Sequence, residues 1–325
     1  MHSVVTYDLL VLAFGAIAFG FYLLMKGGDW TIDAAVYLAE SAGLSKLFVG
    51  ATILAFGTSV PELFASVNAN LAGFPGISIG NVIGSNLANI LLVLGATALV
   101  YPVMCNPRDI MPDILMMLLA SFALLGAMQM DVIGRGTGVA FFGVLLAFVL
   151  FQYQAGQNLS SPPEQISEDS DSDVQFRSKA TALGFLLAGF VALAVGSELL
   201  VKGAVTIGLA FGVPEAIIGM TVVAFGTSLP ELATCLAAAA KKHTEMLIGN
   251  IIGSNVFNIL SIVGITAMIK PIAVDANLTG VSLWAMVAVA VLIAGWLLLG
   301  RTLNRTLGVV MTSAYVAFIG MQYLA

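Results

Sequence analysis

The chain has 325 residues, of which 59% are hydrophobic and only 9% are charged, and its mean hydropathy is +1.02. Soluble globular proteins carry about 25% charged residues, so this composition excludes a soluble globular protein and indicates a polytopic membrane protein. The formal net charge of −6 arises largely from one acidic segment and gives no reason to expect a nucleic-acid partner.

Ten apolar stretches follow one another along the chain, each long enough to cross about 30 Å of hydrocarbon with roughly 20 residues. The first begins near residue 9, and since no basic residue precedes it in residues 1–8, we expect a retained span and not a cleaved signal peptide. The others begin near residues 47, 78, 112 and 135 in the first half, and near residues 180, 216, 247, 281 and 304 in the second. The sequence therefore predicts an all-α membrane protein with ten transmembrane helices.

Charged residues interrupt the first span of each half. Asp29, Asp33 and Glu40 do so in the first half, and Glu198 and Lys202 do so in the second. Long charged side chains at a helix end can reach the membrane interface. We expect these two spans to run long and to end in an amphipathic segment that dips into the interface or packs against its neighbours.

A polar segment separates the two halves. Residues 152–179 contain Ser-Ser-Pro-Pro followed by a run of acidic residues, a composition typical of a flexible linker. A calcium-sensing role for this run is an alternative, although the run lacks the glycine-punctuated ligand order of an EF-hand loop. We accordingly expect a first five-helix repeat over residues 1–151, a linker over 152–179, and a second repeat over 180–325.

The two halves are an internal duplication. Gly57 and Gly226 are 169 positions apart, as are Gly80 and Gly249, and residues 50–103 share 25 of 54 positions with residues 219–272. A self-similarity of this length indicates a repeated structural unit.

The basic residues predict the orientation. If the N-terminus lies outside, Arg135, Lys202 and Lys270 lie outside too, and nine basic residues are cytoplasmic: Lys26, Lys46, Arg108, Arg177, Lys179, Lys241, Lys242, Arg301 and Arg305. The positive-inside rule favours this arrangement, with both termini outside and the linker in the cytoplasm. Because each half has an odd number of spans, the two copies cross the membrane in opposite directions. This is the inverted repeat of many secondary transporters.

The repeated motif Gly-Thr-Ser-x-Pro-Glu places a carboxylate in the middle of an apolar span, at Glu62 and again at Glu231. Such a group costs roughly 2.5–3.5 kcal/mol at the bilayer centre and usually marks a functional site. On a helix, Thr58, Ser59 and Glu62 project to one side. Pro61 removes a backbone donor, and we expect it to loosen the helix around Gly57 and to free carbonyls such as those of Ala55 and Thr58.

The next span of each half adds a polar stripe at four-residue spacing: Asn81, Ser85 and Asn89, and then Asn250, Ser254 and Asn258. Each stripe lies on one helical face, and pure packing does not require it. The glycines between these residues, Gly80, Gly84, Gly249 and Gly253, permit close helix approach and are equally well explained as packing residues.

In an inverted pair, Glu62 and Glu231 would face one another near the midplane, surrounded by hydroxyls, amides and carbonyls. Oxygen ligands suit hard cations such as calcium or sodium, and two carboxylates neutralise one divalent ion. The same pair could instead hold monovalent ions or protons, or could merely lock the bundle by hydrogen bonds.

Other metal or redox chemistry is not indicated. Cys105 and Cys235 lack the spacing of a disulfide framework or a zinc site, and His2 and His243 are too peripheral for a metal cluster. We expect neither a cofactor nor covalent catalysis.

Residues 57–62 with 80–89, and residues 226–231 with 249–258, resemble the two alpha-repeats of the calcium/cation antiporter superfamily, and within it those of the sodium/calcium exchangers. The resemblance extends over all ten predicted spans. The proton/calcium branch usually carries Asn in place of the Thr-Ser-x-Pro pattern, so the chain is more similar to the sodium-coupled branch.

The resemblance implies a role for each residue of the two motifs. Calcium and sodium would share Glu62 and Glu231, and calcium would also bind the backbone carbonyls of Thr58 and Thr227. The remaining residues would line the flanking sodium sites or complete the central cavity. They are the sodium-site side chains Ser59, Ser85, Ser228 and Ser254, the sodium-site carbonyls of Ala55 and Ala224, and the cavity residues Asn89 and Asn258.

The chain departs from the family pattern at a few places. Asn258 stands where some members carry Asp, a carboxylate associated with potassium dependence in one branch, so no potassium requirement is expected. Ser45-Lys46 in the first repeat corresponds to Pro214-Glu215 in the second, a change expected to affect only a loop. The large cytoplasmic regulatory domain of animal exchangers is missing, which implies a prokaryotic transporter of the plasma membrane.

The sequence thus predicts an antiporter that exchanges calcium for sodium by alternating access, with the two ions and the lipid bilayer as its partners. A proton/calcium antiporter is the nearest alternative. A cation channel built from the same helices is a further one.

Overall fold

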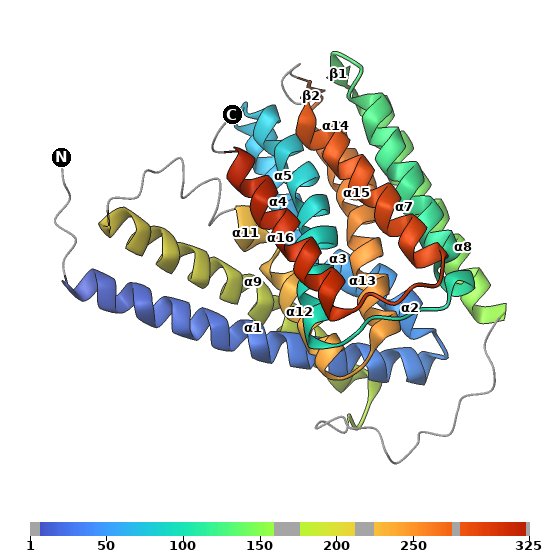
Figure 1. Cartoon of the computed structure of the whole chain (residues 1–325), viewed down its shortest axis with the longest axis horizontal. Coiled ribbons are helices and arrows are strands. Elements are labelled where there is room, and N and C mark those ends of the chain that lie inside the picture. Colours follow the sequence, from blue (N-terminus) through green and yellow to red (C-terminus); the bar gives the residue numbers. More distant parts are fainter. Residues whose placement is uncertain (1–6, 159–175, 212–223, 275–279, 323–325) are drawn as a thin grey trace.

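The fold is helical in the computed structural model, which describes residues 7–158, 176–211, 224–274 and 280–322 (Figure 1). The first half contains α1 (Tyr7–Ala42), α2 (Lys46–Val49), the π-helix η1 (Gly50–Leu54), α3 (Ala55–Thr58), α4 (Val60–Leu71), α5 (Pro75–Leu87), the π-helix η2 (Ala88–Val93), α6 (Leu94–Val100), α7 (Pro107–Ala127), β1 (Val132–Ile133) and α8 (Arg135–Asn158). The second half contains α9 (Lys179–Ala210), α11 (Ala224–Thr227), α12 (Leu229–Ala240), α13 (Thr244–Phe257), the π-helix η4 (Asn258–Val263), α14 (Gly264–Ile269), β2 (Ile272–Ala273), α15 (Val281–Leu298) and α16 (Arg305–Gln322).

Seven of the helices in the described residues are long and apolar enough to cross a membrane, and an eighth span results if the bent pair Lys46–Thr58 and Val60–Leu71 is taken as one. The sequence predicted ten spans. The span expected near residue 216 lies partly in residues 212–223, outside the described residues, so only its continuation in α11 and α12 is seen. The last span corresponds to α16, whose apolar part, Arg305–Met321, is like α12 too short to be counted among the seven. The protein is therefore a multi-pass helical membrane protein with seven or eight candidate spans.

Local capping explains where several of these helices begin. The side chain of Ser45 accepts a hydrogen bond from the Phe48 amide at the start of α2, and Ser178 does the same for Thr181 at the start of α9. Such caps satisfy backbone donors that have no partner within the helix. Asn106 caps α7. Proline suits the first position of this helix, Pro107, because the backbone N–H that proline lacks would have no partner within the helix there.

The segment between the halves is shorter than the sequence predicted. Helix α8 continues to Asn158, so residues 152–158, which were predicted to belong to the linker, are helical. At the other end, Phe176 packs against Tyr37 of α1, with a ring-centroid separation of 5.4 Å. The acidic run lies in residues 159–175, outside the described residues.

Helices α1 and α9 lie side by side along much of their length, to one side of the other helices (Figure 1). Glycines permit this approach: a Cβ atom added to Gly20 would lie 2.6 Å from the carbonyl oxygen of Gly196, and one added to Gly27 would lie 3.0 Å from that of Gly189. The offset of 169 positions relates Gly20 to Gly189 and Gly27 to Gly196. The Gly20–Gly196 and Gly27–Gly189 contacts are therefore equivalent to one another when the two halves are exchanged.

The same exchange relates contacts elsewhere in the bundle, although the offset is 170 positions for Gly138 and Gly308 and for Ile133 and Leu303. Gly308 of α16 closely approaches the Gly95 carbonyl of α6, and Gly138 of α8 closely approaches the Gly264 carbonyl of α14. The backbone pairs Val103–Leu303 and Ile133–Ile272 are related in the same way. The two-residue strands of the second pair were not predicted. The last helix of each half thus packs on the other half.

Charged residues near the end of α1 bind neighbouring elements. Lys241 lies 2.6 Å from Asp33 and 3.8 Å from Asp29, and Lys46 lies 3.1 Å from Glu40. This part of α1 therefore packs against its neighbours, which is one of the two arrangements that the sequence predicted for it. In α9, the corresponding pair, Lys202 and Glu198, is largely exposed.

Candidate functional site

The site forms where two helices break. Helix α3 ends at Thr58, and the axis turns by 43° before α4. Ser59, at the break, has φ −84° and ψ 3°, and Ser228 occupies the equivalent break between α11 and α12 with φ −89° and ψ 4°. The sequence predicted the loosened turn around Gly57. The break lies at Ser59 because Pro61 falls in the first turn of α4, where its missing donor is tolerated.

The backbone at the two breaks differs in detail. The Ser59 amide donates to the Ala55 carbonyl at 3.2 Å, whereas the Ser228 amide donates to the Phe225 carbonyl, also at 3.2 Å. The prediction that the Ala55 carbonyl is freed was therefore wrong, although a carbonyl oxygen keeps a second lone pair. Ala224 is the first residue of α11.

Glu62 and Glu231 lie in the first turns of α4 and α12, where the helix N-terminus favours a negative charge. Both side chains are 1% exposed, and the two carboxyl groups are close enough to interact electrostatically. Ser59 donates to Oε1 of Glu231 at 3.1 Å, whereas the Thr58 hydroxyl donates to the Leu54 carbonyl of its own helix at 3.0 Å. Two carboxylates from different halves therefore share one buried space.

Asn89 and Asn258 lie in the π-helices η2 and η4, and both are buried. Among the described residues, neither the amide nitrogen nor the amide oxygen of either side chain has a hydrogen-bond partner. Single π-helical turns within α-helices occur frequently at functional sites, and both asparagines fall on such a turn.

The other asparagines of the two stripes have structural partners. Asn81 donates to the Glu62 carbonyl at 3.2 Å and to the Ser66 hydroxyl at 2.9 Å, and Asn250 donates to Sγ of Cys235 at 3.3 Å. These contacts hold the carboxylate-bearing helices against the stripe helices. The sequence did not predict that Ser66 and Cys235 would be the partners of these asparagines. The two residues occupy equivalent positions, 169 residues apart, in the two halves.

The stripe glycines differ between the halves. A Cβ added to Gly253 would overlap the Ala51 carbonyl, and one added to Gly249 would overlap the Leu47 carbonyl, whereas Gly80 and Gly84 have open space. Close packing therefore accounts for Gly249 and Gly253 and leaves the first pair unexplained.

Unpaired buried polar atoms are concentrated in this region. The described residues contain 13 buried side-chain nitrogen or oxygen atoms without a partner, and eight of them belong to Glu62, Asn89, Ser228, Glu231 and Asn258. Such atoms are almost always paired in folded proteins, so this concentration indicates a ligand site. Ser85 and Ser254 are buried as well, and Thr227 is partly buried.

The donor set limits what the site can bind. In the part of the chain that the structure describes, no three residues among His, Cys, Asp and Glu lie close enough together to hold a metal. Two carboxylates with neutral hydroxyl and amide oxygens remain. Oxygen donors of this kind suit hard cations, and thiolate or imidazole ligands for a soft metal are absent from these site residues.

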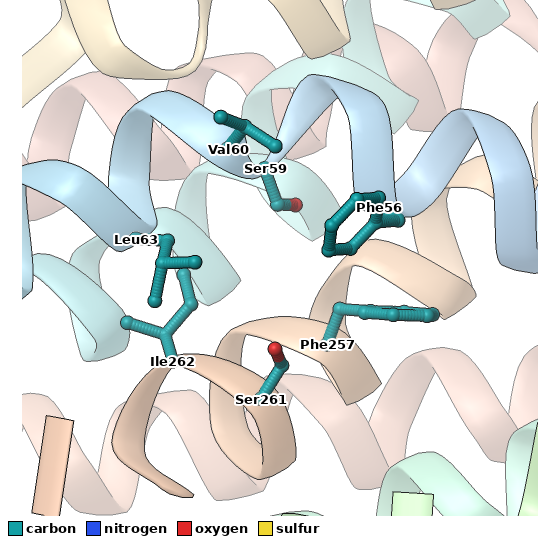
Figure 2. A pocket seen from close by; sticks show the side chains of 7 residues that line it. All are labelled: Phe56, Ser59, Val60, Leu63, Phe257, Ser261 and Ile262. Atoms are coloured by element: carbon teal, nitrogen blue, oxygen red, sulfur yellow. The ribbon is translucent and has the colours of Figure 1, made fainter. Parts of the chain in front are cut away.

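A small cavity of about 10 Å³ adjoins the site, between the α3–α4 break and η4. Its lining consists of Phe56, Ser59, Val60, Leu63, Phe257, Ser261 and Ile262. Figure 2 shows the hydroxyls of Ser59 and Ser261 pointing into the same space from opposite helices. Ser261 was not predicted as a site residue, since Leu92 stands at its counterpart in the first repeat.

Comparisons with known proteins show that the chain is similar to sodium/calcium exchangers. The family described as "Sodium/calcium exchanger protein" matches residues 12–154 and 181–324. CaxA of Alkalimonas amylolytica is 35% identical over 311 residues, covering 94% of this chain and 96% of its own, and the sodium/calcium exchanger MaX1 of Methanosarcina acetivorans is 28% identical, covering 97% and 98%. The structure of the sodium-calcium exchanger NCX_Mj from crystals soaked without Na⁺ and Ca²⁺ superposes with a TM-score of 0.82 at 30% identity, covering 96% of this chain and 99% of NCX_Mj.

Proposed function

Since the chain belongs to the sodium/calcium exchanger family, we propose that it exchanges calcium for sodium by alternating access. The unpaired polar atoms on Glu62, Glu231, Asn89, Asn258 and Ser228 carry this proposal, because a cation that binds there would supply the partner that each oxygen lacks. Solved structures of the similar NCX_Mj come from crystals soaked with sodium and with strontium or calcium.

We propose that calcium binds between Glu62 and Glu231, whose two charges balance one divalent ion. The carbonyls of Thr58 and Thr227 contribute to this central site, which Asn89 and Asn258 complete. Sodium occupies flanking positions formed by the neutral oxygens of Ser59, Ser85, Ser228 and Ser254, with the carbonyls of Ala55 and Ala224. Such neutral oxygens are ligands that sodium needs and a carboxylate-bound proton does not.

We further propose ten spans arranged as an inverted repeat of five plus five in the plasma membrane, with both termini outside and the central linker in the cytoplasm. The reciprocal glycine contacts of α1 with α9, and of α8 and α16 with the opposite half, support this arrangement. So does the excess of basic residues on the expected cytoplasmic side.

Uptake of calcium-45 into proteoliposomes tests the function. We expect uptake when a sodium gradient is imposed, without any requirement for potassium. Uptake that follows an imposed pH gradient and ignores sodium would contradict the sodium coupling and establish the proton/calcium antiporter instead. Flux that neither saturates nor couples to a second ion would indicate a channel.

A further inference from the structure

The proline at the second break deprives one backbone carbonyl of its helical donor. In a continuous helix, the amide of residue 230 would donate to the carbonyl of Gly226, four residues earlier. Residue 230 is a proline and has no N–H. The hydroxyl of Ser197, a buried residue of α9, donates to this carbonyl at 2.5 Å. A side chain from a different helix therefore supplies the donor that the proline lacks.

The first break cannot be held in the same way. Pro61 deprives the Gly57 carbonyl of its helical donor too, but the position equivalent to Ser197 is Gly28, which has no side chain to donate. A Cβ atom added to Gly28 would lie 2.9 Å from the carbonyl oxygen of Ala233, so a serine does not fit there. The bond from α9 is thus a property of the second half.

One face of α9 contacts both breaks. A Cβ added to Gly57 would overlap the ring of Phe190, and one added to Gly226 would overlap the side chain of Val201. Phe190, Ser197 and Val201 follow one another at spacings of seven and four residues, which places them on one side of the helix. Helix α9 therefore packs on the glycines of both motifs, and Ser197 adds a hydrogen bond to the second.

We propose that Ser197 is a positioning residue for ion binding, whose hydrogen bond fixes the peptide plane after Gly226 and so orients the Thr227 carbonyl and the Ser228 hydroxyl. The proposal rests on the proposed function, in which these two groups are ion ligands. Glycine has more backbone freedom than other residues, so the peptide at Gly226 can rotate once the bond is lost. The ligands that follow it then lose their orientation, and both ions bind more weakly.

Three substitutions of Ser197, assayed in proteoliposomes, separate the effect of the hydroxyl from that of packing. Ser197→Ala removes the hydroxyl, whereas Ser197→Thr and Ser197→Val give side chains of nearly the same shape, of which only threonine has a hydroxyl. For the alanine and valine variants, we expect the sodium and calcium concentrations for half-maximal exchange to rise about two- to tenfold, the usual strength of one hydrogen bond. The threonine variant should stay closer to wild type than the valine variant.

Ser121→Ala is the matched control, since Ser121 is buried in α7 and donates to the Met117 carbonyl of its own helix. It should keep the wild-type values, and wild-type values in Ser197→Ala would overturn the proposal. A lower maximal rate at unchanged half-maximal concentrations would overturn it as well, because a loss of folded protein reduces the amount of transporter and not its ion affinity. Equal impairment of folded threonine and valine variants would show that the hydroxyl is not the cause. If neither of these two folds, the alanine variant decides.

Ion-dependent stability of the purified protein separates this proposal from the exchange function. Calcium chloride or sodium chloride, compared with choline chloride at the same ionic strength, should raise the unfolding temperature of wild type and of Ser121→Ala. The rise at a given ion concentration should be smaller for Ser197→Ala. If this holds while wild type shows no sodium-driven calcium uptake, the positioning role is supported and the exchange function is wrong. If Ser197→Ala shows the same rise as wild type, or if neither ion stabilises wild type, Ser197 does not position an ion ligand.

Discussion

The hydroxyl of Ser59 donates a hydrogen bond to Oε1 of Glu231 at 3.1 Å, across the interface of the two halves. The equivalent pair, Ser228 and Glu62, does not form this bond, since the Ser228 hydroxyl and both Glu62 carboxyl oxygens have no partner among the described residues. The duplicated motifs therefore have the same sequence but unequal hydrogen bonding.

Substitution of either carboxylate should abolish calcium exchange. Glu62→Gln and Glu231→Gln keep the side-chain size but remove one of the two charges that balance a divalent ion. We expect calcium-45 uptake to fall at least about tenfold, because contacts with charged groups contribute roughly 1.5–3 kcal/mol. The control is Glu198→Gln, whose side chain is 64% exposed on α9. Wild-type uptake in either site variant would show that the site is misplaced.

The serines of the two stripes should affect sodium more than calcium. Ser85→Ala and Ser254→Ala each remove a buried neutral oxygen and leave both carboxylates in place. We expect a higher sodium concentration for half-maximal exchange, with a smaller change in the calcium concentration for half-maximal uptake. Ser41→Ala, which removes a hydroxyl near the end of α1 that bonds its own helix, should leave both values unchanged. Variants that alter only the calcium value would contradict the assignment of these serines.

A methyl group at Gly253 should destabilise the protein. A Cβ there overlaps the Ala51 carbonyl, and overpacking typically costs about 1–3 kcal/mol. Gly253→Ala should therefore unfold at a lower temperature in detergent. Gly143→Ala in α8 meets open space and should unfold at the same temperature or slightly higher, because alanine favours helix formation. Equal unfolding temperatures would indicate that α13 and η1 separate easily.

Cys105 should react slowly with maleimides at neutral pH. It lies between α6 and α7, and burial, with a smaller contribution from the Asp109 carboxylate, raises the pKa of its thiol to about 11. The thiolate is the reactive form, so labelling should rise roughly tenfold per pH unit below that value. Cys235→Ala leaves Cys105 as the single thiol and allows the rate to be measured between pH 7 and 9. A rate independent of pH would show that the thiol is not shielded as described.

Cysteine labelling also tests the orientation. In a chain without its two native cysteines, Pro75→Cys should react with an impermeant maleimide added from outside, whereas Glu168→Cys should react only after the membrane is permeabilised. The reverse pattern would invert the proposed topology.

Much of the helical order could be predicted from sequence because apolar length and capping residues are local properties. Arg135 and Val281, for example, begin helices at the predicted positions. The motifs also led to Glu62 and Glu231, since a carboxylate within an apolar span is conspicuous. The exact break at Ser59, the bond from Asn81 to Ser66 and the cavity at Ser261 were not predictable, because they depend on which surfaces of different helices meet. Ser261 in particular is not a repeated residue, because Leu92 occupies the equivalent position in the first half.

The packing of α8 on α14 and of α16 on α6 has a consequence for biogenesis. When the first half has been inserted, the surface of α8 around Gly138 still lacks the Gly264 backbone that it contacts in the finished protein. The first half therefore cannot complete its packing during its own synthesis, and the final structure forms only after the last helix has entered the membrane. Separately expressed halves should accumulate only when both are made in the same cell.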